Sequence, residues 1–333
     1  MSLSDSPREI VVHLGGPKTG STAIQRFLSV ASRDLAERGI LYPDVGLRGF
    51  GHHDLAFLLG GGYPEWATPQ SRGLSALVAD LHTALQRPEP SVVLSSENFF
   101  LQPAPEELRE AIESAESGRR ARLLVYLRRQ DHLVVSWYNQ AVKAQGFSGS
   151  FAECLEATAP QWDFEAQLER WASVFGPDAL SVRLYEPNHL ARGEVVADLL
   201  TELGTDPKGL PAPEQSVNSG LCRELLEFQR QINRLPLTVQ EKRRFHREWI
   251  ELTARTRGTN VFDDTPVVGP AGRRAILDRF HAGNRAVARR FFGREELFAE
   301  PRPEGPEPPE WSGPDPAVTQ LALGWLLART GSG

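Results

Sequence analysis

Residues 10–22 read Ile10-Val11-Val12-His13-Leu14-Gly15-Gly16-Pro17-Lys18-Thr19-Gly20-Ser21-Thr22. The β-branched run at the start is typical of a buried strand, and apolar residues then recur at helical spacing, at Ile24, Phe27, Leu28 and Ala31. A strand, a glycine-rich turn and a helix in this order bring unpaired backbone amides and the positive end of a helix dipole to one point. The segment therefore predicts an anion-binding turn.

Three further apolar runs resemble the first strand, at residues 92–95, 123–127 and 180–185. Stretches with helical periodicity separate them, and this alternation is typical of a parallel sheet covered by helices on both faces. We therefore expect a three-layer α/β fold with a central parallel sheet of about four or five strands. Residues 46–72 are rich in glycine and predict an irregular loop with at most a short central helix.

The C-terminal half is predicted to be helical, with apolar residues at helical spacing in 194–203, 221–235, 239–257 and 271–292. We expect these helices to wrap the sheet rather than form a separate core. The predicted organisation is a disordered N-terminus (1–7), one α/β domain (8–300), a proline-rich linker (301–316) and a short docked C-terminal helix or tail (317–333).

Composition limits the classes of partner. The chain has 333 residues and a net charge of −6, so it has no general attraction for nucleic acid, and any anion must be held by a local cluster of cations and amides. No apolar run is long enough to span a bilayer and the first residues lack signal-peptide features, so we expect a cytoplasmic protein without membrane insertion. The two cysteines, Cys154 and Cys222, indicate neither a disulfide framework nor a zinc site.

The turn differs from the phosphate loop of nucleoside-triphosphate enzymes in the place of its lysine. Gly15 and Gly20 have the spacing of that motif and Thr22 stands at its hydroxyl position, but position 21 is Ser21. The lysine lies inside the loop instead, at Lys18, where a compact charge can neutralise a bridging oxygen as a group leaves. Ser21 and Thr22 can donate hydroxyls to the same anion.

A second polar element follows the third predicted strand, 123–127. Arg128 stands at the carboxyl end of that strand, and Ser136 lies eight residues further on, two turns into a helix predicted to start near Asp131. Ligands of open parallel sheets bind beyond the carboxyl ends of the strands. An arginine fork with a nearby hydroxyl at this edge suits a second phosphate, too far along the ligand for the first loop to reach.

Together the two elements resemble a known family. The strand, Pro17-Lys18-Thr19-Gly20-Ser21-Thr22 and the following helix look like the 5′-phosphosulfate loop of sulfotransferases that use 3′-phosphoadenosine 5′-phosphosulfate (PAPS). Arg128 with Ser136 matches their 3′-phosphate element, and residues 128–140, 283–285 and 291–293 are similar to bacterial sulfotransferase-like proteins. The resemblance covers roughly residues 8 to 300. The Arg-Lys-Gly loop that closes over the nucleotide in cytosolic members has no clear counterpart here, and Arg257-Gly258 is the nearest string.

The resemblance implies a role for each matching residue. Lys18 would assist departure of the 5′-phosphate, Thr19, Gly20, Ser21 and Thr22 would hold that phosphate, and Arg128 and Ser136 would select the 3′-phosphate. The donor would be PAPS, the product adenosine 3′,5′-bisphosphate, and no metal would be required because Lys18, Arg128 and the turn amides supply the positive field.

Sulfuryl transfer also needs a base close to the donor sulfur, because the acceptor must lose a proton as it attacks. Glu97 follows the run at 92–95 and would face the same sheet edge as the loop. The family resemblance supports this choice, because several glycan sulfotransferases use a glutamate as the base. The alternative is that Glu97 caps the following helix or is simply exposed to solvent. The other candidates are His52 and His53, which could contact the acceptor or transfer a proton. The alternative is that these histidines only pack against Phe50 and Phe57.

The sequence thus predicts a PAPS-dependent sulfotransferase acting on a hydroxyl or amine acceptor, with a carbohydrate or a secondary metabolite favoured. A small-molecule kinase is the second hypothesis, although the lysine it needs after the second glycine is missing. A nucleotide-binding protein that transfers nothing is the third hypothesis, because binding and transfer share the same loop.

Overall fold

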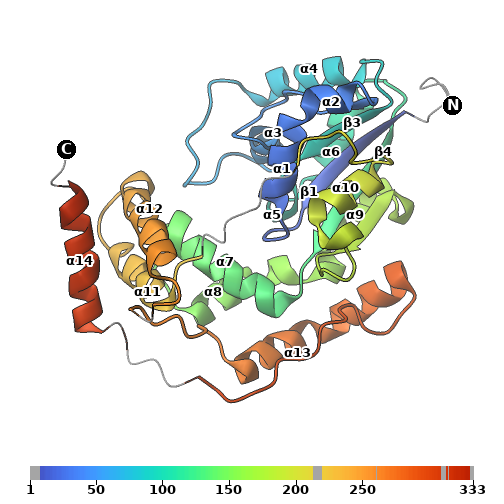
Figure 1. Ribbon diagram of the computed structural model, residues 1–333. Helices are drawn as coiled ribbons and strands as arrows, with labels where there is room; N and C mark the ends of the chain where they lie inside the picture. Colours follow the sequence, from blue (N-terminus) through green and yellow to red (C-terminus); the bar gives the residue numbers. More distant parts are fainter. Residues whose placement is uncertain (1–7, 213–219, 260, 309–312, 314, 331–333) are drawn as a thin grey trace. The chain divides into compact units, whose positions relative to one another are not determined.

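The computed structural model describes residues 8–212, 220–259, 261–308, 313 and 315–330 (Figure 1). The predicted disordered N-terminus, 1–7, lies outside the described residues, as does part of the predicted proline-rich linker. Contacts within the chain divide it into two compact units, which are taken in turn. The first consists of residues up to 129, 161–216 and 281–300, and the second consists of 130–160, 217–280 and the residues from 301 onward.

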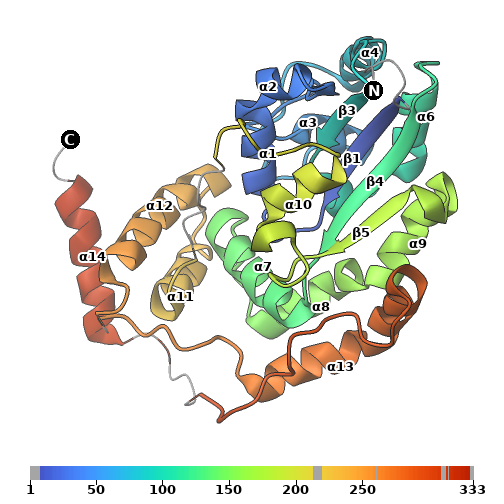
Figure 2. The ribbon, with the colours of Figure 1, turned by 45° about the vertical axis from the view of Figure 1, so that its right-hand side comes forward.

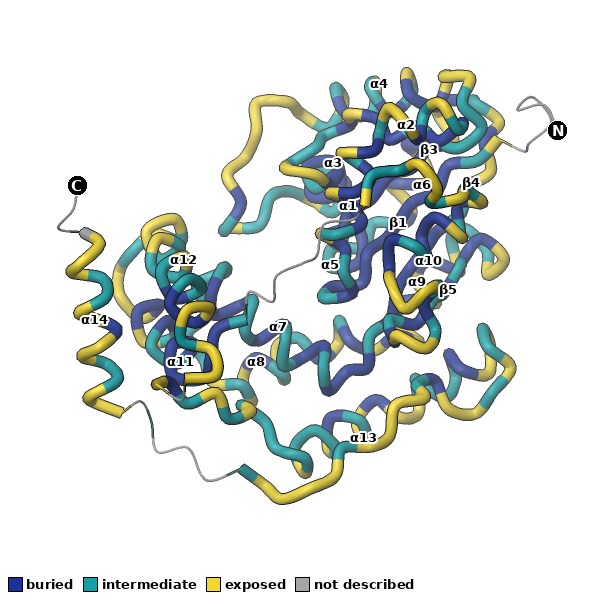
Figure 3. The backbone as a smooth tube through the Cα atoms, in the orientation of Figure 1, coloured by how far each residue is buried: buried dark blue, intermediate teal, exposed yellow. Residues whose placement is uncertain are grey.

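The first unit contains a five-stranded sheet in the order β2-β3-β1-β4-β5. Every neighbouring pair is parallel, which confirms the predicted parallel α/β sheet. The strands are β1 (Glu9–Gly15), β2 (Ile40–Leu41), β3 (Ser91–Ser95), β4 (Arg120–Leu127) and β5 (Leu180–Leu184). The two-residue β2 was not predicted, because two residues are too few to show a period. Figure 3 shows the burial of the central strands, as expected for a sheet covered on both faces.

Helices cover both faces of the sheet (Figure 2). One face carries α1 (Ser21–Val30), α2 (Ser32–Ala36) and α10 (Val195–Glu202), and the other carries α4 (Leu74–Leu85), α6 (Pro105–Glu113) and α9 (Phe164–Phe175). The short helix α3 (His53–Leu59) lies within the glycine-rich segment 46–72, and the short helix α5 (Asn98–Leu101) follows β3. The predicted short helix at the centre of 46–72 is thus confirmed, and so are the three layers.

The apolar stripe of α1 fixes this helix on the sheet. Ile24 and Leu28 are fully buried and Phe27 is 4% exposed, and all three pack in one cluster with β1, β3, β4 and α10. Full burial of each such side chain contributes on the order of 1.5–3 kcal/mol. The helix that begins at the predicted anion loop is therefore a rigid part of the core.

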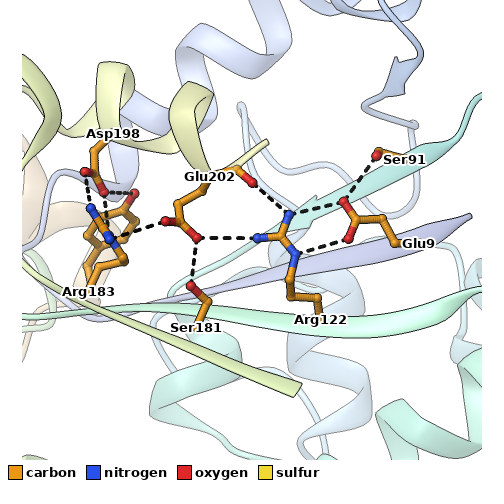
Figure 4. Close-up of polar contacts among 8 residues, drawn as sticks. Glu9, Ser91, Arg122, Ser181, Arg183, Asp198 and Glu202 are labelled. Carbon is orange, nitrogen blue, oxygen red and sulfur yellow. Dashed lines mark hydrogen bonds and ion pairs between the residues drawn. The ribbon is translucent and has the colours of Figure 1, made fainter. Parts of the chain in front are cut away.

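A partly buried polar network lies between the sheet and α10 of this same unit (Figure 4). Arg122 of β4 bonds to both Glu9 and Glu202, and Arg183 of β5 bonds to Asp198 and Glu202. Asp198 is fully buried and also accepts hydrogen bonds from the Tyr126 hydroxyl and the Ala191 amide. Buried carboxylates need such partners, so this network fixes α10 over the sheet.

The second unit is helical. Its helices include α7 (Gln130–Ala144), α8 (Phe151–Thr158), α11 (Arg223–Ile232), α12 (Val239–Thr256) and α14 (Pro316–Thr330), and α13 (Pro270–Val287) runs from this unit into the first. We predicted that the C-terminal helices wrap the sheet, but α11 and α12 pack on α7 and on each other, so their apolar faces are covered within this unit. The predicted domain limits, 8–300, 301–316 and 317–333, remain a prediction.

The last helix, α14, packs on α12. The Trp325 indole donates to Glu248 at 3.1 Å, and Arg329 pairs with Glu248 and Glu251 at 2.6 and 2.9 Å. Helix formation beyond the proline-rich segment was predicted from the spacing of apolar residues in 318–327. Within the described ranges, no helix combines the length and the apolar character needed to cross a bilayer.

Candidate functional site

The loop between β1 and α1 has an unusual backbone. Positive φ angles occur at Gly15 and Gly16 (+88° and +89°), at Lys18 (+65°) and at Gly20 (+81°). Pro17 is held at negative φ by its ring and Thr19 has no positive φ, so the sign of φ alternates from Gly16 to Gly20. Such alternation turns successive amides toward one side and forms an anion-binding concavity. A lysine at positive φ is uncommon and indicates that the surrounding structure holds it there.

Two glycines allow the loop to touch the neighbouring strands. A Cβ atom on Gly15 would lie 2.4 Å from the Cα of Glu97, which follows β3. A Cβ on Gly16 would lie 1.9 Å from the carbonyl oxygen of Tyr126, near the end of β4. No side chain fits at either position, so the loop rests directly on the ends of both strands.

The hydroxyls of the loop have different environments. Thr19 Oγ1 and Ser21 Oγ both donate to the carbonyl of Gly16, so these buried side chains fix the shape of the loop. Thr22 is exposed. Gly20 precedes α1 without a side-chain cap, and the amides of Gly20, Ser21 and Thr22 have no hydrogen-bond acceptor among the residues that the structure describes. Free amides at a helix start are an anion-binding arrangement.

Arg128 lies on this loop. Its Nη1 donates to the carbonyl oxygen of Lys18 at 2.9 Å, and its guanidinium stands 5.8 Å from the centre of the Tyr185 ring. Burial lowers the pKa of Lys18 below its ordinary value, the charge of Arg128 lowers it further, and Glu97 opposes both effects. A bound anion would relieve the repulsion between the two cations, so the loop favours a negatively charged ligand.

Tyr185 is a residue of this site that the sequence analysis did not single out. A Cβ on Gly20 would lie 3.4 Å from Tyr185 Cε2 and 3.6 Å from its hydroxyl, so the ring edge borders the loop. The hydroxyl has no hydrogen-bond partner among the described residues. Its position at the carboxyl end of the predicted strand 180–185 was the available signal, because side chains there reach the same sheet edge as the loop.

Glu97 lies on the other side of the loop from Arg128. It follows β3, which pairs with β1, and its side chain is 30% exposed. Its Oε2 accepts a hydrogen bond from Gln25 Nε2 at 2.8 Å and lies 4.0 Å from His53 Nδ1. The structure therefore brings Lys18, Glu97 and Arg128 together at one edge of the sheet, as the sequence predicted, and adds Gln25.

The two adjacent histidines have different environments because α3 begins between them. His52 is fully buried; its Nε2 bonds to the Pro43 carbonyl at 2.8 Å, and its Nδ1 accepts from the Ser95 amide at 3.0 Å. Burial lowers the pKa of His52 to about 4. Both ring nitrogens are used by the backbone, so we assign His52 a structural role and remove it from the candidate acceptor contacts.

His53 lies beside the candidate base. Its Nδ1 is 2.8 Å from Ser96 Oγ and 2.9 Å from Asn98 Nδ2, in addition to the 4.0 Å approach to Glu97. Its side chain is partly exposed. His53 therefore stays a candidate for acceptor contact, a role that remains a prediction.

The remaining predicted residues are placed as follows. Pro17 is buried in the loop. Ser136 lies in the second turn of α7, in the second unit, and its role at the 3′-phosphate remains a prediction. Among the described residues, no group of three or more His, Cys, Asp or Glu side chains is arranged to hold a metal ion, and Cys154 and Cys222 are buried free thiols.

No family model matches the chain. A curated protein of Archaeoglobus fulgidus, described as uncharacterized, is 27% identical over 182 residues, which are 54% of this chain and 48% of that protein. The chain thus spans about half the length of the curated relative it matches. A solved sulfotransferase from Alicyclobacillus acidocaldarius is similar over 63% of this chain and 87% of its own, with 21% identity and a TM-score of 0.43. Likeness at this level does not identify a function, which has to come from the residues of the site.

Proposed function

We propose that the protein is a sulfotransferase that moves a sulfuryl group from PAPS to a hydroxyl or amine acceptor. The observation that carries the proposal is the position of Lys18 inside the loop. Its carbonyl accepts a hydrogen bond from Arg128, and three free amides follow at the start of α1. A nucleoside-triphosphate loop would place its lysine one residue after the second glycine, where this chain has Ser21. The loop thus suits a phosphate that leaves with a charge on its bridging oxygen.

The residues present fit the two anionic ends of such a donor. The amides of Gly20, Ser21 and Thr22 would hold the 5′-phosphate, with Thr19 keeping the loop in shape. Arg128, fixed by the Lys18 carbonyl and the Tyr185 ring, would select the 3′-phosphate. The role of Ser136 at that phosphate stays a prediction from the sequence resemblance. PAPS, when bound, supplies the sulfuryl group, which leaves the 5′-phosphate oxygen as the acceptor oxygen or nitrogen attacks in line.

Three side chains would then act on charge and protons. Lys18 would neutralise the negative charge that develops on the 5′-phosphate oxygen as the sulfur–oxygen bond breaks. Glu97 would accept the proton that the acceptor loses as its bond to sulfur forms. His53, close to Glu97, would contact the acceptor. A carbohydrate or a secondary metabolite is the favoured acceptor, and the product nucleotide is adenosine 3′,5′-bisphosphate.

Transfer of labelled sulfate tests the proposal. The protein is incubated with sulfur-35-labelled PAPS and a panel of oligosaccharide and phenolic acceptors, without added metal. We expect labelled product, and we expect Glu97→Gln to lose about two to four orders of magnitude in turnover while still binding adenosine 3′,5′-bisphosphate. Unchanged turnover in Glu97→Gln would move the role of base to His53. Binding of PAPS without turnover on any acceptor or on water would favour a nucleotide-binding protein instead.

A further inference from the structure

The amide of Gln25 makes an unusual contact for a residue on the buried face of a core helix. Gln25 lies in the second turn of α1 and is 3% exposed. Its Nε2 donates to Glu97 Oε2 at 2.8 Å across 72 residues of sequence. Among the described residues this is the one hydrogen bond that the Glu97 carboxylate accepts, because His53 Nδ1, at 4.0 Å, is beyond hydrogen-bond distance.

The surroundings leave this amide little freedom. Ile24, Phe27 and Leu28 of the same helix are buried in the core and prevent α1 from turning. The backbone of Gly51 covers the amide from the loop side, since a Cβ there would lie 2.9 Å from both Cδ and Oε1 of Gln25. Glu97, in contrast, keeps 30% of its side chain exposed. The buried Gln25 amide thus fixes one oxygen of the Glu97 carboxylate, while the rest of the carboxylate stays accessible to a ligand.

We propose that Gln25 is a positioning residue that fixes the Glu97 carboxylate for proton transfer, which rests on the proposed role of Glu97 as base. A neutral amide suits this task. It orients the carboxylate through a directed hydrogen bond but adds no positive charge, whereas a lysine or arginine at the same place would weaken the carboxylate as a base. Gln25 also sits on the helix that begins at the anion loop, so one rigid element places both the phosphate amides and the base.

Substitution of Gln25 tests this role against a matched control. Gln25→Leu keeps the size of the side chain but removes the donor. Gln231→Leu removes the same kind of bond, from Gln231 Nε2 to Glu227 Oε1 at 3.1 Å, on the exposed surface of α11. We expect Gln25→Leu to lower kcat for PAPS turnover about 10- to 100-fold, because a misplaced base costs up to that much, and to move the acidic limb of the rate profile to higher pH. Affinity for adenosine 3′,5′-bisphosphate should stay within twofold, and Gln231→Leu should change none of these values.

The double variant Gln25→Glu/Glu97→Gln separates positioning from simple stabilisation. It rebuilds an amide–carboxylate hydrogen bond with the carboxylate on α1 instead of after β3. We expect the urea midpoint to return toward that of the parent protein while turnover stays at the level of Glu97→Gln. Recovery of turnover in the double variant would overturn the proposal, because the place of the carboxylate would then be irrelevant.

A measurement on the protein without any ligand keeps this proposal distinct from the proposed function. The side-chain amide signals of Gln25 in a nitrogen-15 NMR spectrum should shift in Glu97→Gln and should follow the protonation of Glu97 on titration with acid. Signals that ignore both changes overturn the hydrogen bond itself. If the signals respond but Glu97→Gln keeps full turnover, the hydrogen bond is present and Glu97 is not the base. The role that we give to Gln25 would then fall as well.

Discussion

Replacing Gly16 by alanine should show how tightly the anion loop rests on β4. The new Cβ would lie 1.9 Å from the Tyr126 carbonyl oxygen, whereas an ordinary carbon–oxygen contact is about 3.3 Å or more. The carbonyl would have to move by more than about an ångström, and Tyr126 is fully buried in the sheet with its hydroxyl bonded to Asp198. Alanine at a φ of +89° adds strain on the order of 1–2 kcal/mol. We expect a total loss of about 4–5 kcal/mol.

Gly176→Ala is the matched control, because Gly176 has a similar φ of +85° but no atom within 4 Å of its Cβ position. Its ψ of 149° lies in a region that residues other than glycine avoid, so it should lose only this backbone strain, about 1–3 kcal/mol. The assay is hydrogen exchange of peptides that cover β1 and β4, because these peptides report the local stability where the loop contacts the strand. Equal losses in the two variants, to within about 0.5 kcal/mol, would refute the close contact between loop and strand.

Three further changes test the fold and the charges of the site. Burial lowers the pKa values of His13 and His52 to about 4, so between pH 6.5 and 4 the unfolded chain binds protons that the folded chain does not bind. The stability of the first unit should therefore fall, as the pH is lowered across that window, by up to about 3 kcal/mol for each histidine. Urea unfolding of His52→Gln should show a weaker pH dependence. Asp198→Ala should cost about 3–5 kcal/mol in the same assay, because it leaves the partly buried Arg183 without its shortest ion pair. The pKa of Lys18 lies below its ordinary value, so Lys18 loses its charge at a lower pH than an exposed lysine does. The affinity for adenosine 3′,5′-bisphosphate should therefore begin to fall at that lower pH as the pH is raised. Calorimetry on Lys18→Met should show no such fall.

The sequence predicted the local elements of the site well because each has a local cause. The β-branched run before Gly15 and the apolar stripe after Ser21 define β1 and α1, and both are found where predicted. The placement of Arg128 on the loop also followed from the sheet, since parallel strands end at one edge.

Contacts between distant segments were beyond the sequence. Gln25 is a polar residue on the buried face of α1. The residues around it in the sequence do not show that β3 pairs with β1, the pairing that brings Glu97 next to Gln25. His52 and His53 looked equivalent, but the start of α3 sends one into the core and the other toward Glu97. The helical spacing of apolar residues predicted that α11 and α12 each have an apolar face. It does not predict which element packs on that face, and in the structure this element is α7 rather than the sheet.

Isothermal titration calorimetry with adenosine 3′,5′-bisphosphate tests the central claim, that this loop holds a sulfate-donor nucleotide, most directly. The titration is done without metal and is compared with ATP in the presence of magnesium. We expect the bisphosphate to bind more tightly than ATP with magnesium, and Arg128→Ala to abolish most of that preference because it removes the guanidinium that would select the 3′-phosphate. Tighter binding of ATP with magnesium, or a bisphosphate affinity unchanged in Arg128→Ala, would contradict the assignment of the loop.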